Sequence, residues 1–244
     1  RKTTVNSISL EVSGTGMMDH VQAPDLVREL DLASQWADSQ KHRKVKFEKE
    51  EDPVVFSYVN KYPRVEHFCL MSAAESYTGF HIDFHGSSVW YHVLEGEKIF
   101  FIIEPSEENI QKYERYLKDK TDFRFFGDIV DKCTRVVIKA GQTLMLPSGW
   151  IHAVFTPKDS LVFGGNFIHP RSLEMQLKII AHENKLNLNK GEKYPQSDQV
   201  FLHYIEHVVK NTTGQCHIRP TPRNRKGLQY VGQKYIEKGN HRKI

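Results

Sequence analysis

The chain has 244 residues, of which 39% are hydrophobic and 26% charged, with a net charge of +4 and three cysteines. A chain of this size and composition can bury a core without disulfides, which argues against a disulfide-stapled scaffold and against a disordered protein. No apolar run approaches the ~18 residues of a membrane span, so we expect no membrane partner. The cysteines are far apart and form no C-x-x-C pair, which argues against a structural zinc site and indicates a reducing compartment, the cytosol or nucleus.

Positive charge is concentrated at the C-terminal end of the chain. Residues 217–244 contain eight Lys or Arg and one acid, a net charge of +7, which leaves −3 for the rest of the chain. Such a tail suits an anionic partner such as DNA or an acidic nucleosome surface. A solvated tail without a specific partner explains the composition equally well.

In chain order, hydrophobic spacing predicts a strand at 5–12 and a helix over 24–36, with Pro24 at its first turn. The dense mixture of charges at 38–52 favours an exposed connection. Strands rich in Val, Ile, Phe, Tyr and Thr are then predicted, with Gly and Pro turns between them, at 54–58, 66–72, 80–84, 87–93, 97–104, 134–139, 142–147, 152–156 and 160–168.

Three further helices are predicted around these strands, at 106–118, 172–186 and 198–210, the last two amphipathic and packed on the β-core. Many short strands without long helices between them argue for a jelly roll or barrel rather than a parallel α/β sheet. The fold class that we predict is therefore mainly β with flanking α-helices.

The pair with the clearest chemical implication is His81 and Asp83, in the stretch SYTGFHIDF. Two residues apart on a strand, they would face the same side with backbones ~6.6 Å apart and could share one ion. Non-haem Fe(II) oxygenases use two His and one carboxylate. The leading third ligand is His152, after a Pro-Ser-Gly turn, although spacing alone leaves His67, His85, His92 and His169 as competitors. A satisfied histidine beside a surface carboxylate is the alternative.

Three longer stretches carry a family resemblance: SYTGFHIDFHGSSVWYHVLEGEKIFFIIEP, FGDIVDKC and GQTLMLPSGWIHAVFTPKDSLVFGGNFIHP. They resemble the Jumonji C (JmjC) catalytic domain of histone lysine demethylases, in particular the plant-homeodomain–Jumonji subfamily (the lysine demethylase 7 group) and next the F-box-linked JmjC demethylases. The resemblance is densest over 66–182. It implies a double-stranded β-helix, a cupin-like jelly-roll barrel, with N-terminal and C-terminal helices.

On this basis the chain is divided into four parts. Residues 1–65 form an N-terminal strand and helix region, and residues 66–170 the JmjC jelly-roll catalytic core. Residues 171–211 are C-terminal helices packed on the core, and residues 212–244 are a basic extended tail.

The resemblance implies that His81, Asp83 and His152 ligate Fe(II) and that 2-oxoglutarate chelates the same ion. The far carboxylate of 2-oxoglutarate would meet Lys98 and the hydroxyl of Thr78. Burial of a dicarboxylate requires such a cation, and Lys98 has apolar neighbours in KIFFII. Three further polar residues are implied to line the same pocket: Tyr91, Asn166 and Asn6. The dry wall of the pocket is predicted to come from Phe80, Phe84, Trp90, Phe101 and Phe163.

The implied reaction uses Fe(II), O₂ and 2-oxoglutarate. It hydroxylates an N-methyl group of mono- or dimethyl-lysine on the histone H3 tail, with lysines 9 and 27 expected, and releases formaldehyde, succinate and CO₂. The nucleus is then the expected location. Two alternatives stay open: a JmjC protein hydroxylase with a stable hydroxylated product, and a non-enzymatic chromatin-binding JmjC module. The second should lack a ligand or the cosubstrate lysine, and none is missing.

Two departures from the family pattern stand out. His85-Gly86 stands where family members commonly have Gly-Gly after H-x-D-F. On a continued strand His85 would share the ligand face, but we expect it to turn outward at the strand end. No Cys/His set for a plant-homeodomain finger is present, so a reader domain would lie outside these 244 residues.

Overall fold

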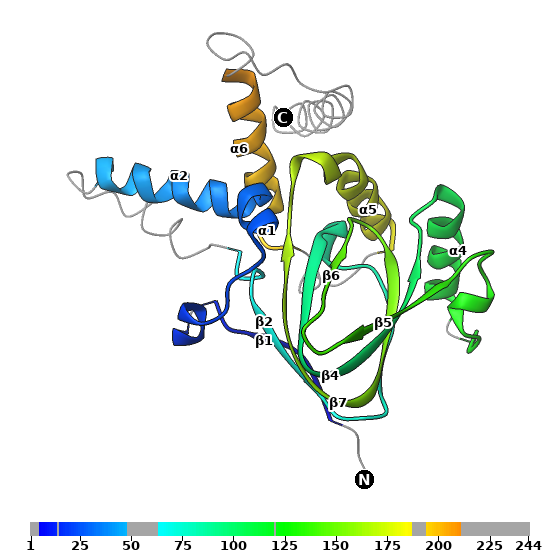
Figure 1. The fold of residues 1–244 in the computed structure, drawn as a ribbon. Coiled ribbons are helices and arrows are strands. Elements are labelled where there is room, and N and C mark those ends of the chain that lie inside the picture. The colour runs from blue at the N-terminus through cyan, green and yellow to red at the C-terminus, as the bar shows by residue number, and fades with distance from the viewer. Residues whose placement is uncertain (1–4, 14, 48–62, 120, 187–193, 211–244) are drawn as a thin grey trace.

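The computed structural model describes residues 5–13, 15–47, 63–119, 121–186 and 194–210. The predicted strand at 54–58 and the predicted basic tail lie outside these residues. Seven antiparallel strands dominate the described part (Figure 1): β1 Asn6–Glu11, β2 Phe68–Ser72, β3 Ser76–His81, β4 Ser88–Ile103, β5 Thr134–Lys139, β6 Thr143–Leu146 and β7 Ile151–Phe167.

The long strands β4 and β7 form the frame of the barrel. The first half of β4 pairs with the second half of β7, and the second half of β4 with the first half of β7. β1, β2 and β6 extend the first pairing, while β3 and β5 extend the second. Two antiparallel layers that share two long strands make a jelly roll, so the predicted mainly β class is confirmed.

A bend at Gly96 separates the two layers. The β4–β7 register shifts between Val93 and Ile99, and Gly96 has a φ of 85°. A Cβ at Gly96 would lie 2.2 Å from the carbonyl oxygen of Asp159, so only glycine fits here. Each long strand thus contains two of the strands that the sequence predicted separately: 87–93 with 97–104, and 152–156 with 160–168.

The predicted strand at 80–84 is wrong, because β3 ends at His81 and a 3₁₀ turn, η2 Phe84–Gly86, follows. His85 and Gly86 have φ values of 49° and 63°. Left-handed residues cannot continue a β ladder, so the chain turns here.

The N-terminal helix differs from its prediction in two ways. It is split at Asp31 into α1 Asp25–Leu30 and α2 Leu32–Phe47. Asp31 is extended, and its carboxylate accepts hydrogen bonds from the N–H groups of Ser34 at 2.9 Å and Ile168 at 3.1 Å, which caps α2 and ties it to the sheet. The predicted exposed connection at 38–52 is wrong for residues 38–47, which continue α2; residues 48–52 lie outside the described part.

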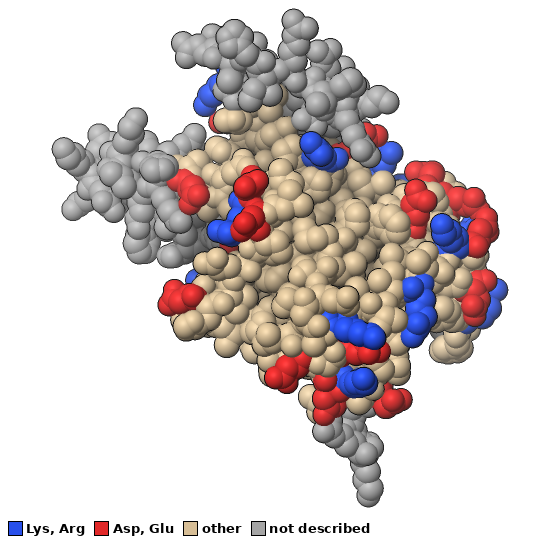
Figure 2. Space-filling view, viewed as in Figure 1, with Lys and Arg blue, Asp and Glu red and all other residues tan. Residues whose placement is uncertain are grey.

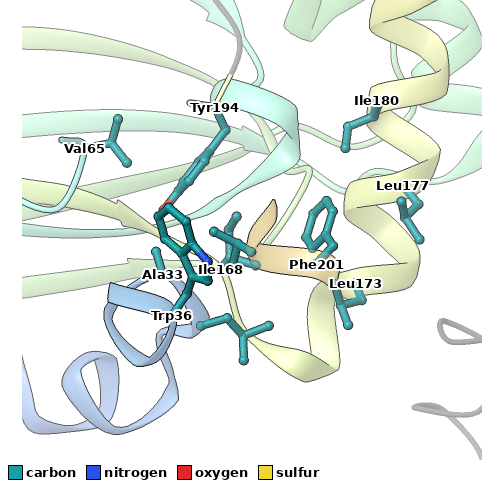
Figure 3. Packing of buried hydrophobic residues seen from close by; sticks show 11 residues of the cluster. Ala33, Trp36, Val65, Ile168, Leu173, Leu177, Ile180, Tyr194 and Phe201 are labelled. Atoms are coloured by element: carbon teal, nitrogen blue, oxygen red, sulfur yellow. The ribbon is translucent and has the colours of Figure 1, made fainter. Parts of the chain in front are cut away.

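The other helices agree with prediction to within about two residues: α4 Glu107–Lys118, α5 Leu173–Leu186 and α6 Ser197–Lys210. Short 3₁₀ turns complete the fold at Gly16–Asp19 (η1), Phe126–Asp128 (η3) and Pro170–Ser172 (η4). Ile168 at the end of β7 is the meeting point of α2, α5 and α6, where Trp36, Leu177 and Phe201 are buried (Figure 3). This helical cluster packs against Phe68 of β2 and Phe84 of η2.

The surface of the described part carries no large patch of one charge on the face shown in Figure 2, where acidic and basic side chains are interspersed around an uncharged centre. Within the described residues, no helix combines the length and the apolar character needed to cross a membrane.

Candidate active site

Three side chains converge from β3, from the turn that follows it and from the neighbouring strand β7. His81 ends β3 and lies opposite His152 of β7 in the antiparallel register, with their ring centroids 4.1 Å apart. Asp83 follows in the turn after β3, and its Oδ2 is 3.6 Å from Nε2 of His152. This distance is less than two metal–ligand bonds of about 2.1 Å, so one ion can contact both atoms without a rearrangement. Among the described residues, these three form the one group of His, Cys, Asp or Glu whose ligand atoms lie within 4.8 Å of one another.

Both histidines are oriented by backbone carbonyls. Nδ1 of His81 is 2.8 Å from the Gly79 oxygen, and Nδ1 of His152 is 3.1 Å from the Trp150 oxygen. A carbonyl only accepts, so Nδ1 carries the hydrogen in each ring, and each Nε2 presents a lone pair to the shared space. The donor set therefore fits a divalent ion held by two imidazoles and one carboxylate.

The surroundings of His152 favour its neutral, metal-binding form. Burial and then the nearby His81 lower the pKa of His152 to about 4, more than Asp83 and the Trp150 carbonyl raise it. The ring of Phe100 stacks against it at a centroid distance of 6.1 Å. The imidazole is thus neutral at pH 7 without help from a metal, and its single hydrogen is on Nδ1.

A cavity of about 590 Å³ extends from the three side chains into the barrel, between the two layers of strands. Thr78, Tyr91, Lys98 and Asn166 line it together with the three convergent residues. Asn6 does not line the cavity, although the sequence placed it there. The volume is in the range of pockets for small ligands.

Lys98 is the cation of this cavity, and it is 2% exposed. Its ammonium donates to the hydroxyls of Ser72 at 2.7 Å and Thr156 at 2.8 Å. Burial lowers the pKa of Lys98 to about 8, so the side chain is still mostly protonated at neutral pH. A buried ammonium with hydroxyl partners suits an anion that enters the cavity.

A chain of hydrogen bonds runs from Lys98 to Thr78 behind the cavity wall. Ser72 donates to Oδ1 of Asn6 at 2.7 Å, and Nδ2 of Asn6 donates to the Thr78 hydroxyl at 3.3 Å. Asn6 therefore contacts the lining through Thr78.

Sequence analysis did not identify Ser72 and Thr156 as partners of Lys98. The period-two spacing of Thr156 from His152 could have indicated a shared face, whereas Ser72 comes from the separately predicted strand β2.

Tyr91 and Asn166 complete the polar lining on the other layer. Burial raises the pKa of the Tyr91 phenol, which stays protonated as a hydrogen-bond donor. Nδ2 of Asn166 donates to the Ser87 hydroxyl at 3.0 Å. Both side chains are at most 8% exposed, so little water competes for their remaining hydrogen bonds.

The apolar wall agrees with prediction only in part. Phe80 and Phe84 line the cavity, as does Phe100, which was not predicted. Trp90, Phe101 and Phe163 do not line it. Trp90 and Phe163 pack with Ala23 and Val27, and Phe101 packs against the cluster under α4.

His85 points away from the three convergent residues, but toward α5 and α6 and not toward solvent as the sequence suggested. Its Nδ1 is 2.9 Å from the Ser197 hydroxyl, and its side chain is only 12% exposed. The left-handed backbone at His85 reverses the direction that a continued strand would have given.

The comparisons with known proteins all point to one family. The JmjC domain family, described as a hydroxylase, matches residues 68–167. "JmjC domain-containing histone demethylation protein 1" of Caenorhabditis elegans is 42% identical over 244 residues, which are 100% of this chain and 23% of that protein. "Lysine-specific demethylase 2A" of Xenopus tropicalis is 40% identical over 219 residues, 89% of this chain and 19% of that protein. "Lysine-specific demethylase 7A" of Homo sapiens is 43% identical over 197 residues, 80% of this chain and 19% of that protein.

The chain thus spans between 19% and 23% of the length of these relatives. The matched segment runs from the start of β2 to the end of β7 and includes His81, Asp83, Lys98 and His152. The predicted resemblance is confirmed: residues 68–167 of the chain form a domain of the JmjC family.

Proposed function

We propose that the chain is the catalytic domain of an Fe(II)- and 2-oxoglutarate-dependent dioxygenase that demethylates lysine on the histone H3 tail. One observation carries the proposal. A two-His, one-carboxylate group and a buried ammonium with hydroxyl partners line the same cavity. A hydrolytic metal site needs the three ligands and an open position for water, but not the second, cationic subsite.

The roles proposed for the chain's residues follow from their positions. Fe(II) with 2-oxoglutarate and O₂ supplies the oxidising power to hydroxylate an N-methyl group, whose hydroxymethyl product releases formaldehyde. His81, Asp83 and His152 would hold the ion from one side and leave its other positions open. Lys98 and Thr78 would bind the far carboxylate of 2-oxoglutarate. The Tyr91 and Asn166 side chains would add hydrogen bonds, with Phe80, Phe84 and Phe100 limiting access of water.

The substrate part of the proposal rests on family likeness. Two of the relatives are named lysine-specific demethylases and one a histone demethylation protein. We propose mono- and dimethyl-lysine at lysines 9 and 27 of histone H3 as substrates, and the nucleus as the site of action. DNA or an acidic nucleosome surface as a partner of residues 217–244 stays a prediction, as does a reader domain outside this chain.

The test is mass spectrometry of H3 peptides of defined methylation, incubated with the chain, Fe(II) and O₂. We expect loss of methyl groups from peptides methylated at lysines 9 and 27, with matched formation of succinate, only when 2-oxoglutarate is present. Peptides methylated at other H3 lysines are the matched control for position. Absence of succinate with every peptide would contradict the proposal and favour a non-enzymatic chromatin-binding module.

A second function, protein hydroxylation, is favoured by the family description as a hydroxylase. Its metal and cosubstrate sites would be the same. The two reactions differ in the product, since a hydroxylase leaves one added oxygen atom on the side chain and removes no methyl group. The same spectra therefore decide between them.

A further inference from the structure

The turn that carries Asp83 is held in an unusual way. Asp83 is the N-cap residue of η2, and its carbonyl accepts the N–H of Gly86 at 2.8 Å. Within this turn His85 adopts φ 49° and ψ 30°, a left-handed conformation that side chains other than Gly, Asn and Asp rarely take. A residue stays in such a conformation when its surroundings hold it there.

Two helices from the C-terminal part hold His85. Glu183 of α5 accepts the backbone N–H of His85 at 3.0 Å, and its other oxygen lies 3.5 Å from Nε2 of the ring. Nδ1 lies 2.9 Å from the hydroxyl of Ser197, the first residue of α6. The tautomer that fits both neighbours carries its hydrogen on Nε2, toward the carboxylate, so that Nδ1 accepts from the serine. The His85 and Glu183 side chains are only 12% and 10% exposed, so water competes little with these contacts.

The same helix also supports the turn before His152. A Cβ at Gly86 would lie 2.9 Å from the Ile179 side chain, and a Cβ at Gly149 would lie 3.3 Å from it. The Ser148 hydroxyl donates to the Gly86 carbonyl and so joins the two turns. Ile179 of α5 therefore lies against both turns, the one that follows Asp83 and the one that precedes His152.

We propose that His85 is a positioning residue for the metal centre, which fixes the Asp83 turn by binding α5 through Glu183 and α6 through Ser197. A glycine at this position would keep the N–H bond to Glu183 but would lose both contacts of the ring. The glycine of the Gly-Gly pattern has no ring to make these two contacts, so in this chain the Asp83 turn depends on the placement of α6. The inference rests on the proposed metal site.

The test measures Co(II) binding to the metal-free full chain by calorimetry and by the visible absorption bands of Co(II), without cosubstrate or peptide. His85→Gly suits the left-handed backbone and removes only the ring. We expect its Kd for Co(II) to rise about tenfold, the lower end of the range for residues that orient ligands. We also expect altered absorption bands. Ser197→Ala should raise the Kd about threefold.

The matched control is His92→Ala, which removes another ring bonded to a hydroxyl, that of Thr143 at 2.8 Å, on an exposed part of β4 and β6. Its Kd and bands should equal those of the wild type. If His85→Gly does not fold, Ser197→Ala decides, because it removes the hydroxyl partner of the ring and leaves the left-handed backbone of His85 unchanged. A Ser197→Ala variant with wild-type Kd and bands would then overturn the inference.

The outcomes separate this inference from the proposed function. Wild-type binding of one Co(II), with a His85→Gly variant whose Kd and bands are unchanged, overturns the positioning role alone. A lower melting temperature with unchanged Co(II) bands and Kd has the same meaning, because it shows a purely structural role. A wild-type chain that binds no Co(II) overturns the proposed function and this inference together.

Discussion

The metal end and the lysine end of the cavity differ in the exposure and the hydrogen bonding of their polar side chains. At the metal end, His81 and Asp83 are partly exposed, stand at a strand end and in a turn, and are close in sequence. At the lysine end, Lys98 is buried within a long strand and is satisfied by hydroxyls from two other strands. The side chains at the metal end are arranged to bind an ion. The Lys98 ammonium, in contrast, already donates two hydrogen bonds before any anion binds.

This difference has an energetic consequence. The buried charge of the Lys98 ammonium destabilises the free protein, as the lowered pKa of Lys98 indicates. The cost is recovered when an anion binds. Removal of the Asp83 carboxylate should therefore abolish function and leave stability almost unchanged, while removal of the Lys98 charge should weaken 2-oxoglutarate binding and raise stability.

The largest effect is expected for Asp83→Ala. Loss of one of three ligands should weaken Co(II) binding and reduce turnover by more than about a hundredfold, beyond the range for residues that only orient ligands. The melting temperature of the metal-free protein should barely change, because Asp83 holds its turn through its backbone carbonyl and makes no side-chain cap bond there. Asp19→Ala, at an exposed acid of η1, is the control. Substantial activity of Asp83→Ala would refute the ligand assignment.

Lys98→Met should have the next largest effect. It leaves the far carboxylate of 2-oxoglutarate without its cation, and calorimetry should show affinity for 2-oxoglutarate reduced by at least about a hundredfold, as when a buried ion pair loses one partner. The free energy of unfolding of the free protein should rise by roughly 1–3 kcal/mol, since Met removes a buried charge. Lys139→Met, at an exposed position of β5, should change neither quantity. A destabilised Lys98→Met protein would contradict the comparison.

The pH dependence of stability tests the same group. The folded protein has a Lys98 pKa of about 8, below the ordinary 10.5, so between these values the unfolded state binds more protons. The free energy of unfolding should therefore increase as pH rises from about 8 to 10.5, by roughly 2–3 kcal/mol, relative to Lys98→Met. Denaturant titrations of both proteins across this range give the difference. Saturating 2-oxoglutarate should reduce the slope, because a bound carboxylate raises the pKa of Lys98.

The smallest effect is expected for Thr156→Val, which removes one hydroxyl from Lys98 without changing the shape of the side chain. The Kd for 2-oxoglutarate should rise about three- to tenfold, equivalent to one hydrogen bond of about 1 kcal/mol. The Kd for Co(II) should stay at the wild-type value. Thr134→Val, at the exposed first position of β5, is the control. An equal loss of both affinities would show that the two ends of the cavity are not independent.

Much of the fold could be predicted from the sequence. Period-two alternation and the Gly and Pro turns identified the β-rich region, and helical spacing identified α4, α5 and α6. Local charge was misleading at residues 38–47, where α2 continues through a highly charged segment. The break at Asp31 was also invisible, because it depends on the N–H of Ile168, far away in the sequence.

The sequence by itself determined which residues could carry chemistry: a His-x-Asp pair, a second histidine after a tight turn and a lysine among apolar residues. Only the tertiary structure decided how they meet. His81 and Asp83 converge because the strand ends between them, and not because a strand continues. Tyr91 and Lys98 are seven residues apart, so they would face opposite sides of a regular strand, yet the bend at Gly96 brings both into the cavity. The direction of His85 was likewise set by Glu183 and Ser197, about a hundred residues away, because a side chain follows the partners that the fold supplies.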